Sequence, residues 1–259
     1  MHPILTTLHF GDRAIPIGGY GVLLALALLV GGVVALRSAV RLQLDAGAFI
    51  ASLAAAIGSG LLGGSLLFAL IGLLQTGTLG PPGLVFYGGA ILGALGFALT
   101  ARAHGLPLAT ALDASVPALP LAHALGRLGC LLGGCCYGAR FSGPWAITYT
   151  DGLAPAAHPA WPRHPWPLYE ALVLLALAAF FASRWAPAAG SGRRSALYVL
   201  CYALARFALE PLRGDAVRGV TVLGALSTSQ LISLTLGLGA LSFLWLARRR
   251  SLTRSAGLP

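Results

Sequence analysis

The sequence predicts an all-α integral membrane protein with about seven transmembrane helices. Of its 259 residues, 57% are hydrophobic and 9% are charged, whereas charged residues make up about 25% of an ordinary soluble domain. The mean hydropathy is +0.83. Several uncharged stretches reach the roughly 20 residues that a helix needs to cross a bilayer. We therefore expect one polytopic membrane domain over residues 1–259.

Arginines, prolines and glycines separate the predicted spans. The first span ends before Arg37, and a charge-free stretch at 46–101 is too long for one helix, so QTGTLGPPG at 75–83 divides it. A polar, Pro-rich segment at 137–167 is too long for a simple connection. The expected spans are 17–36, 47–74, 84–100, 110–135, 168–185, 196–212 and 223–247.

The distribution of arginine orients these spans. Cytoplasmic segments are enriched in basic residues, so the side with more arginines is predicted to be cytoplasmic. That side carries Arg37, Arg41, Arg102, Arg184, Arg193, Arg194, Arg248, Arg249, Arg250 and Arg254, whereas the other carries Arg13, Arg140, Arg163, Arg213 and Arg218. The N-terminus and the 137–167 loop then face outward, and the C-terminus faces the cytoplasm.

Neither nucleic-acid binding nor a removable leader is expected. The net charge is +10, but the basic residues are dispersed between apolar segments and form no basic domain. The N-terminus lacks a basic n-region and an A-x-A cleavage pattern, so the first helix is expected to stay in the membrane.

An arginine lies within the fourth predicted span, in GRLGC at 126–130. His123 precedes Arg127 by four residues and Cys130 follows it by three, so a helix places all three on one face. Ionisable groups at membrane depth are costly unless paired or hydrated. A guanidinium offers a planar fork of donors that suits phosphate or carboxylate. Arg127 is therefore a candidate anion ligand; the alternative is a structural arginine paired with Asp113 or a carbonyl.

A polar stripe follows the sixth predicted span. Tyr198, Tyr202, Arg206 and Glu210 recur every four residues, and Arg213 follows three residues later. Such spacing puts them on one face of an otherwise apolar helix. Arg206 and Glu210 can form a simple i,i+4 pair. Two arginines and two tyrosines exceed what one glutamate requires, which favours a polar cavity lined by the stripe.

Three further segments offer candidate site residues. In RHPWPLYEA at 163–171, His164 can titrate near neutral pH and serve as a base, and Glu170 near a helix N-terminus is favoured by the macrodipole alone. In GLVFYGGAILG at 83–93, Tyr87 precedes a glycine pair where a broken helix would line a cavity. Tyr20 opens the first span. Either tyrosine can instead be an interfacial anchor.

The cysteines leave three interpretations open. Cys130, Cys135 and Cys136 lack C-x-x-C spacing, and Cys201 stands alone on another span. They can pack as small apolar residues, form a disulfide at an oxidising outer face, or be reactive or metal-binding. A zinc site would need four nitrogen or sulfur ligands, so His123 or His164 would have to contribute.

These segments, in this order, resemble the prolipoprotein diacylglyceryl transferase family, bacterial enzymes that move the diacylglyceryl group of phosphatidylglycerol onto a lipobox cysteine. GRLGC resembles the family's G-R-x-G-N, and RHPWPLYEA its R-H-P-S-Q-L-Y-E. YALARFALEPLRGD at 202–215 resembles R-F-x-x-E-x-x-R. STSQLISL at 227–234 is similar to G-Q-x-L-S, and IGGYGVLLAL at 17–26 to the first-helix W-Y-G.

The resemblance implies a multi-pass transferase of the bacterial inner membrane with an outward N-terminus, no cofactor and no metal. Its partners would be phosphatidylglycerol, the lipobox of a prolipoprotein and membrane lipid. Arg127 and Arg206 would bind the lipid phosphate or the forming glycerol phosphate, and Glu210 would orient Arg206. The expected substrate-binding residues are Tyr20, Cys130, His164, Glu170, Tyr202, Glu210 and Arg213.

The sequence departs from the family's pattern at several positions. The family's H-G-G reads Tyr87-Gly88-Gly89, its signature asparagine is Cys130, and its signature glutamate is Cys135. The second span lacks the family's G-R-I-G arginine. His123 replaces the usual base in our interpretation, with Tyr87 and His164 as the other candidates. Alternatives are a paralogue that modifies another acceptor and a non-catalytic protein that binds or transports anionic lipid.

Overall fold

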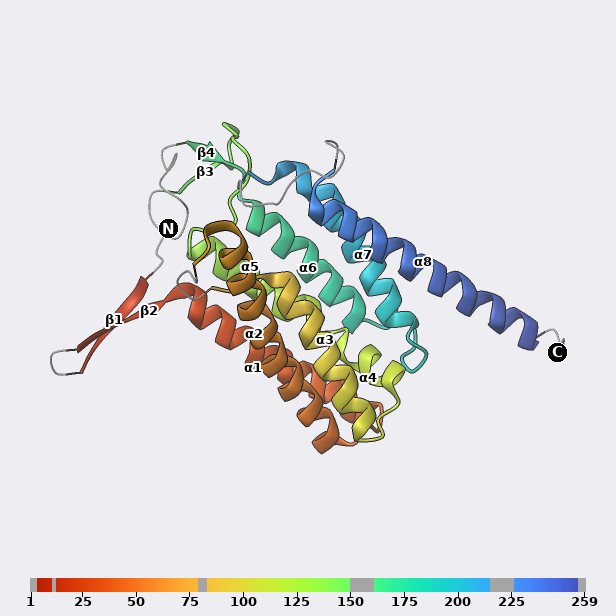
Figure 1. Cartoon of the computed structure of the whole chain (residues 1–259). Helices are drawn as coiled ribbons and strands as arrows, with labels where there is room; N and C mark the ends of the chain where they lie inside the picture. The colour runs from red at the N-terminus through yellow and green to blue at the C-terminus, as the bar shows by residue number, and fades with distance from the viewer. Residues whose placement is uncertain (1–3, 11–12, 79–82, 150–160, 215–225, 256–259) are drawn as a thin grey trace. The chain divides into compact units, whose positions relative to one another are not determined.

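The structure is a computed structural model and describes residues 4–10, 13–78, 83–149, 161–214 and 226–255 (Figure 1). The regular secondary structure of these residues is helical apart from two antiparallel hairpins. The chain forms two compact units. One comprises Met1–Val33, Val116–Ala188 and Arg193–Pro259, and the other comprises Val34–Ser115 and Ala189–Gly192.

The first unit contains a row of packed helices. Helix α5 packs on α6, α6 contacts α7, and α7 packs along α8 (Figure 1). Helix α1 also begins in this unit, and a 3₁₀ turn, η1, extends α7. The bounds are Gly19–Arg41 for α1, Ala118–Leu132 for α5, Trp166–Ala182 for α6, Arg193–Leu209 for α7, Glu210–Leu212 for η1 and Thr228–Ser255 for α8.

Two hairpins were not expected in an all-α fold. Strands β1 (Ile4–Phe10) and β2 (Arg13–Gly18) pair before the first span. Strands β3 (Ile147–Thr148) and β4 (Pro162–Arg163) pair within the predicted outer loop. The first hairpin had a sequence signal, because two runs rich in β-branched and aromatic residues flank a Gly-Asp dipeptide.

The second unit contains α2 (Ala46–Thr76), α3 (Phe86–Ala103) and α4 (Leu108–Ser115). Asp45 caps α2 by accepting a hydrogen bond from the Ala48 amide at 2.6 Å. Helices α2 and α3 lie side by side (Figure 1), and the Ser59 hydroxyl on α2 donates to the Leu92 carbonyl on α3 at 2.9 Å. Small residues allow this close approach.

Gly88 on α3 tests that packing. A Cβ at Gly88 would collide with the Gly63 backbone of α2 and lie 2.7 Å from the Leu67 Cβ. We expect Gly88→Ala to destabilise the protein by about 1–3 kcal/mol, the usual cost of overpacking. Gly58→Ala on α2 is the matched control, since a Cβ there meets nothing within 4 Å. Thermal unfolding in detergent measures both, and equal midpoints would contradict the prediction.

Among the described residues, five helices are long and apolar enough to span a membrane, and six if α4 and α5 together make one broken span. The fourth predicted span, 110–135, is therefore wrong as one continuous helix. Pro117 lies at the interruption, where the proline ring prevents a regular helix. The fifth predicted span, 168–185, corresponds to α6, which has 17 residues. An integral membrane fold is confirmed; seven spans and the orientation stay predictions.

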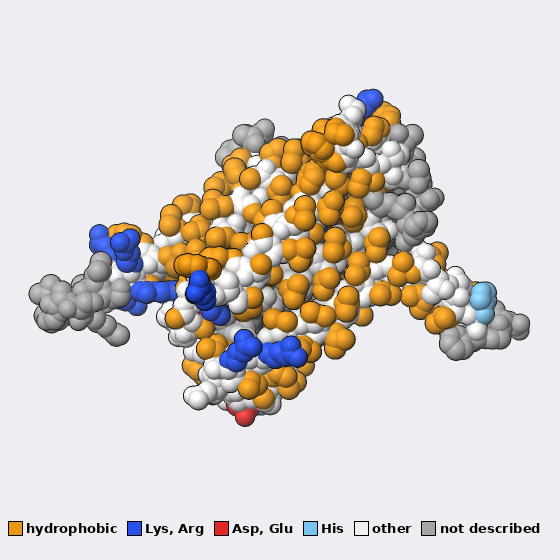
Figure 2. Space-filling view, turned by 180° about the vertical axis from the view of Figure 1, so that it is seen from behind, with side chains coloured by type: hydrophobic (Ala, Val, Ile, Leu, Met, Phe, Trp, Pro, Cys, Tyr) orange, Lys and Arg blue, Asp and Glu red, His pale blue; other side chains and the backbone are white. Residues whose placement is uncertain are grey.

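The surface also matches a membrane environment. Figure 2 shows hydrophobic side chains across most of the face in view, with arginines in a few places. Large apolar side chains are exposed on several helices, with exposed fractions of 67% for Leu29, 76% for Leu74 and 63% for Leu204. Apolar surface of this extent requires a lipid or protein environment.

Candidate active site

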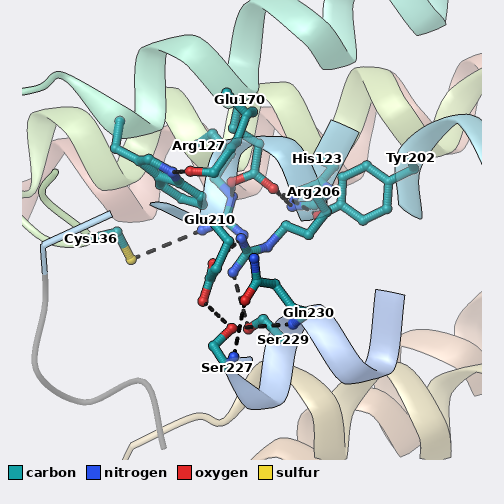
Figure 3. Close-up of polar contacts among 12 residues, drawn as sticks. His123, Arg127, Cys136, Glu170, Tyr202, Arg206, Glu210, Ser227, Ser229 and Gln230 are labelled. Atoms are coloured by element: carbon teal, nitrogen blue, oxygen red, sulfur yellow. Dashed lines mark hydrogen bonds and ion pairs between the residues drawn. The ribbon is translucent and has the colours of Figure 1, made fainter. Parts of the chain in front are cut away.

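A buried carboxylate on α6 joins three other helical residues. Glu170 is 1% exposed and lies 2.8 Å from the Arg127 Nε on α5. The Tyr202 hydroxyl on α7 donates to the other carboxylate oxygen at 2.7 Å, and the His123 Nε2 lies 3.8 Å from that oxygen. The His123 and Tyr202 rings meet edge to face (Figure 3). Four residues from three helices thus form one polar cluster.

This cluster corrects two interpretations from the sequence. Glu170 pairs with Arg127, so the helix macrodipole alone does not explain a carboxylate at this position. Asp113, the partner considered for Arg127, instead accepts hydrogen bonds from the Gly190 and Gly192 amides at 2.9 Å each. Spacing along one helix could not identify the contact between Glu170 and Arg127, because it joins two helices.

A second ion pair lies at the end of α7. Arg206 donates to Glu210, and its other terminal nitrogen donates to the Ser229 hydroxyl at 3.1 Å. The Ser227 hydroxyl donates to Glu210 at 2.8 Å (Figure 3). Ser227 and Gln230 bond reciprocally, side chain to backbone amide, as a capping box that starts α8. The start of α8 therefore fixes the orientation of the pair.

The polar stripe on α7 contains the i,i+4 ion pair between Arg206 and Glu210. This pair was one of the two interpretations of the stripe. Arg206 is 8% exposed and Glu210 2% exposed, so the pair is buried. Tyr198 and Tyr202 stack, with ring centroids 6.2 Å apart. The cavity that the stripe was expected to line stays a prediction.

Trp166 connects the two ion pairs, and the sequence interpretation missed it. The guanidinium carbons of Arg127, Arg206 and Arg213 lie 5.2, 5.0 and 4.8 Å from its ring centroid. The ring is fully buried, and its Nε1 donates to the Leu209 carbonyl at 2.8 Å. Three guanidiniums therefore gather around one buried indole, an arrangement that suits an anion.

Replacing Trp166 tests its role as a platform for the arginines. Trp166→Phe keeps an aromatic ring but removes the hydrogen bond to Leu209 and weakens the cation–π contacts. We expect a loss of about 1–3 kcal/mol in unfolding free energy. Trp185→Phe is the control. Trp185 is 73% exposed, and Arg184 is the one described arginine that stacks on its ring. Equal thermal midpoints for the two variants would contradict the prediction.

The three cysteines near the end of α5 lie together as free thiols. The Sγ atoms of Cys130, Cys135 and Cys136 are within 4.8 Å of one another, and Cys201 on α7 is also a free thiol. The structure contains no disulfide among these four cysteines. Arg127 Nη1 donates to the Cys136 Sγ at 4.0 Å. Hydrogen bonds from Cys130 and Cys135, together with the Arg127 charge, lower the pKa of Cys136.

His164 belongs to an aromatic cluster. Its ring stacks on Phe141 with centroids 4.0 Å apart, and its Nδ1 lies 3.0 Å from the Tyr169 hydroxyl. Trp145 donates its indole hydrogen to the same hydroxyl at 2.8 Å. These contacts hold the ring in place, and a role for His164 at the site stays a prediction.

The two remaining tyrosines lie on α1 and α3. Tyr20 packs on Gly129 of α5, where a Cβ would lie 3.2 Å from the Tyr20 Cδ2. Glycine therefore lets Tyr20 approach the helix that carries Arg127. Tyr87 lies in the first turn of α3, edge to face with Phe86, in the second unit. Helix α3 is continuous from Phe86 to Ala103, so the expected break after Tyr87 is not present.

Comparison with known proteins identifies the family. Residues 7–246 match the sequence pattern of the family described as prolipoprotein diacylglyceryl transferase. A phosphatidylglycerol–prolipoprotein diacylglyceryl transferase of Clostridium tetani is 35% identical over 243 residues, 90% of this chain and 93% of the relative. The second such transferase of Clostridium perfringens is 37% identical over 160 residues, 61% of this chain and 60% of the relative. The chain therefore belongs to the prolipoprotein diacylglyceryl transferase family.

Proposed function

We propose that this protein transfers the diacylglyceryl group from phosphatidylglycerol to the lipobox cysteine of prolipoproteins and releases glycerol phosphate. The names of the two relatives give this reaction for them. The observation that carries it here is the arrangement of Arg127, Arg206 and Arg213 around Trp166. Guanidiniums gathered around one buried ring suit a phosphodiester and its phosphate product.

The reaction places different demands on the two reacting groups. The cysteine thiol loses its proton and attacks the glycerol carbon that bears the phosphate. A sulfur–carbon bond forms, the carbon–oxygen bond breaks, and the electron pair stays on the phosphate oxygen. Arg127 and Arg206 stabilise the charge that develops on that leaving group. Their carboxylate partners, Glu170 and Glu210, hold both guanidiniums in place before substrate binds.

His123 is the proposed base for the thiol. It shares a face of α5 with Arg127 and contacts Glu170 and Tyr202. Tyr87 is the second candidate, from its place in the family's H-G-G segment. Full activity in both His123→Ala and Tyr87→Phe would show that neither residue is the base.

We further propose a location in the bacterial inner membrane, with an outward N-terminus and a cytoplasmic C-terminus. The excess of arginines on one side of seven spans supports this orientation. Seven spans require α6 to cross the bilayer and α4 with α5 to make one broken span. Single cysteines introduced at Thr78 and Gly190 should label from opposite sides of the membrane.

A direct assay tests the reaction. Purified protein is incubated with phosphatidylglycerol and a lipobox peptide, and the peptide is weighed by mass spectrometry. We expect a diacylglyceryl mass increase, and none when serine replaces the peptide's cysteine. Absence of any increase would favour the lipid-binding or transport alternative. Activity on the peptide without rescue of a transferase-depleted strain would favour a paralogue with another acceptor.

A further inference from the structure

The end of α5 folds back so that two cysteines meet. The Cys135 amide donates to the Cys130 carbonyl at 3.0 Å, and the Gly134 amide donates to the Leu131 carbonyl at 3.3 Å. Gly134 has a φ of 67°. This is a Schellman motif, which places the residue after the left-handed glycine against the helix residue five positions earlier. That contact is usually hydrophobic, and here both of its residues are cysteines.

Cys136 brings a third sulfur to the same point. Its φ is 56°, in the left-handed region that favours glycine. A non-glycine residue keeps such a conformation only where its surroundings require it, and these positions concentrate at functional sites. The three Sγ atoms lie within 4.8 Å of one another. Three sulfurs bound to one zinc ion at about 2.3 Å lie roughly 3.8 Å apart, so movements of about 1 Å complete the site.

The surroundings of the sulfurs favour a metal-thiolate centre. Zinc bound by three thiolates carries one negative charge, and Arg127 Nη1 lies 4.0 Å from the Cys136 Sγ. The same guanidinium reaches Glu170 through its Nε. Soft thiolate ligands select zinc or monovalent copper over magnesium or calcium. Three protein ligands leave one of the four tetrahedral positions of zinc for a substrate, as in catalytic zinc sites.

We propose that Cys130, Cys135 and Cys136 bind one Zn²⁺ ion and that its fourth position takes the thiol of the protein substrate. The inference rests on the proposed function for the identity of that thiol. It replaces the expectation of a site without metal, which came from the family resemblance alone. Because Arg127 contacts Cys136, its guanidinium would lie between the zinc-bound nucleophile and the departing phosphate.

The step follows from ordinary zinc–thiol chemistry. The substrate thiol binds zinc as a thiolate and gives its proton to His123, the base proposed above, because a coordinating thiol is deprotonated. The zinc-bound sulfur forms a bond to the glycerol carbon, the carbon–oxygen bond breaks, and the electron pair leaves with the phosphate. The product is a thioether, a weaker ligand than a thiolate, so it dissociates and restores the open position.

Metal content provides a test that does not depend on activity. Protein is purified without chelators, loaded with Zn²⁺ or Co²⁺ alone, and its metal is measured by mass spectrometry. We expect about one zinc per chain, and about a tenfold loss in the triple variant Cys130→Ser, Cys135→Ser, Cys136→Ser. Cys201→Ser on α7 is the matched control and should keep the metal. Thiolate-to-cobalt charge-transfer bands should follow the same pattern.

The open position has its own readout. A lipobox peptide should change the visible spectrum of the cobalt-loaded protein, and the peptide with serine in place of cysteine should not. Chelation of the unmodified protein should abolish peptide alkylation, and added zinc should restore it. This chelation experiment uses the native chain, so it holds even where a cysteine variant fails to fold.

The outcomes separate this inference from the proposed function. Full alkylation by the metal-free protein overturns the zinc proposal and leaves the transferase supported. A disulfide between two of the three cysteines in untreated protein that binds no zinc also overturns it. Stoichiometric zinc and a spectral response to the thiol peptide, without alkylation by the zinc-loaded protein, support the site and overturn the transferase.

Discussion

Arg206→Ala should lower the turnover of the diacylglyceryl transfer by about 1,000-fold, and Arg206→Lys by about 100-fold. Both variants remove the planar fork with which one guanidinium binds Glu210 and Ser229 and, in the proposed reaction, the phosphate. The alanine variant also leaves the buried Glu210 without its cation, which costs about 3–5 kcal/mol of stability. The lysine variant keeps a charge near Glu210 and should unfold close to the unmodified protein.

The lysine variant therefore separates catalysis from stability. Initial rates in the peptide assay and thermal midpoints in detergent are measured for both variants. Arg194→Ala is the control on the same helix. Among the described residues, the Arg194 Nε donates to the Pro187 carbonyl, and this contact lies away from Glu210. Undiminished turnover in a folded Arg206→Lys protein would mean that Arg206 merely neutralises Glu210.

Much of the fold could be predicted because charge is so rare in this chain. Uncharged stretches between arginines identify helices α1, α2, α3, α7 and α8 to within a few residues at most ends. The break at Pro117 had a visible signal in the proline itself. The first hairpin was missed because a short β segment beside a long apolar helix is a weak pattern.

The site could be predicted only along single helices. The i,i+4 rule brought together Arg206 and Glu210, and it put His123 on the face of Arg127. The partner of Glu170 and the place of Trp166 were not predicted, because both depend on how α6 packs between α5 and α7. No spacing rule predicts which helices become neighbours.

The cysteines show the same limit at shorter range. The spacing from Cys130 to Cys135 is that of a Schellman motif, and Gly134 is its usual glycine, so this contact could have been predicted. The left-handed conformation of Cys136 could not, because bulky residues rarely adopt it.

Glu170→Gln should be the most destabilising conservative change in the site. It removes the buried charge that balances Arg127 and weakens the hydrogen bond from Tyr202. An uncompensated buried arginine costs about 3–5 kcal/mol, which lowers the thermal midpoint by roughly 6–20 °C at about 2–4 °C per kcal/mol. Asp113→Asn is the control, because Asp113 accepts backbone amides and an asparagine oxygen can replace it. Its midpoint should fall by less than half as much.

Replacing both members of the pair should then restore stability without restoring activity. In Arg127→Met with Glu170→Met, no buried charge lacks its partner, and apolar substitutes for buried ion pairs are often neutral or stabilising. We expect a thermal midpoint within about 5 °C of the unmodified protein but peptide alkylation reduced by at least about 100-fold. Since the double variant is folded, its lost activity reports on the chemistry of Arg127 and not on its contribution to stability. Alkylation at the normal rate would show that Arg127 and Glu170 serve the fold alone, and that the phosphate is bound elsewhere.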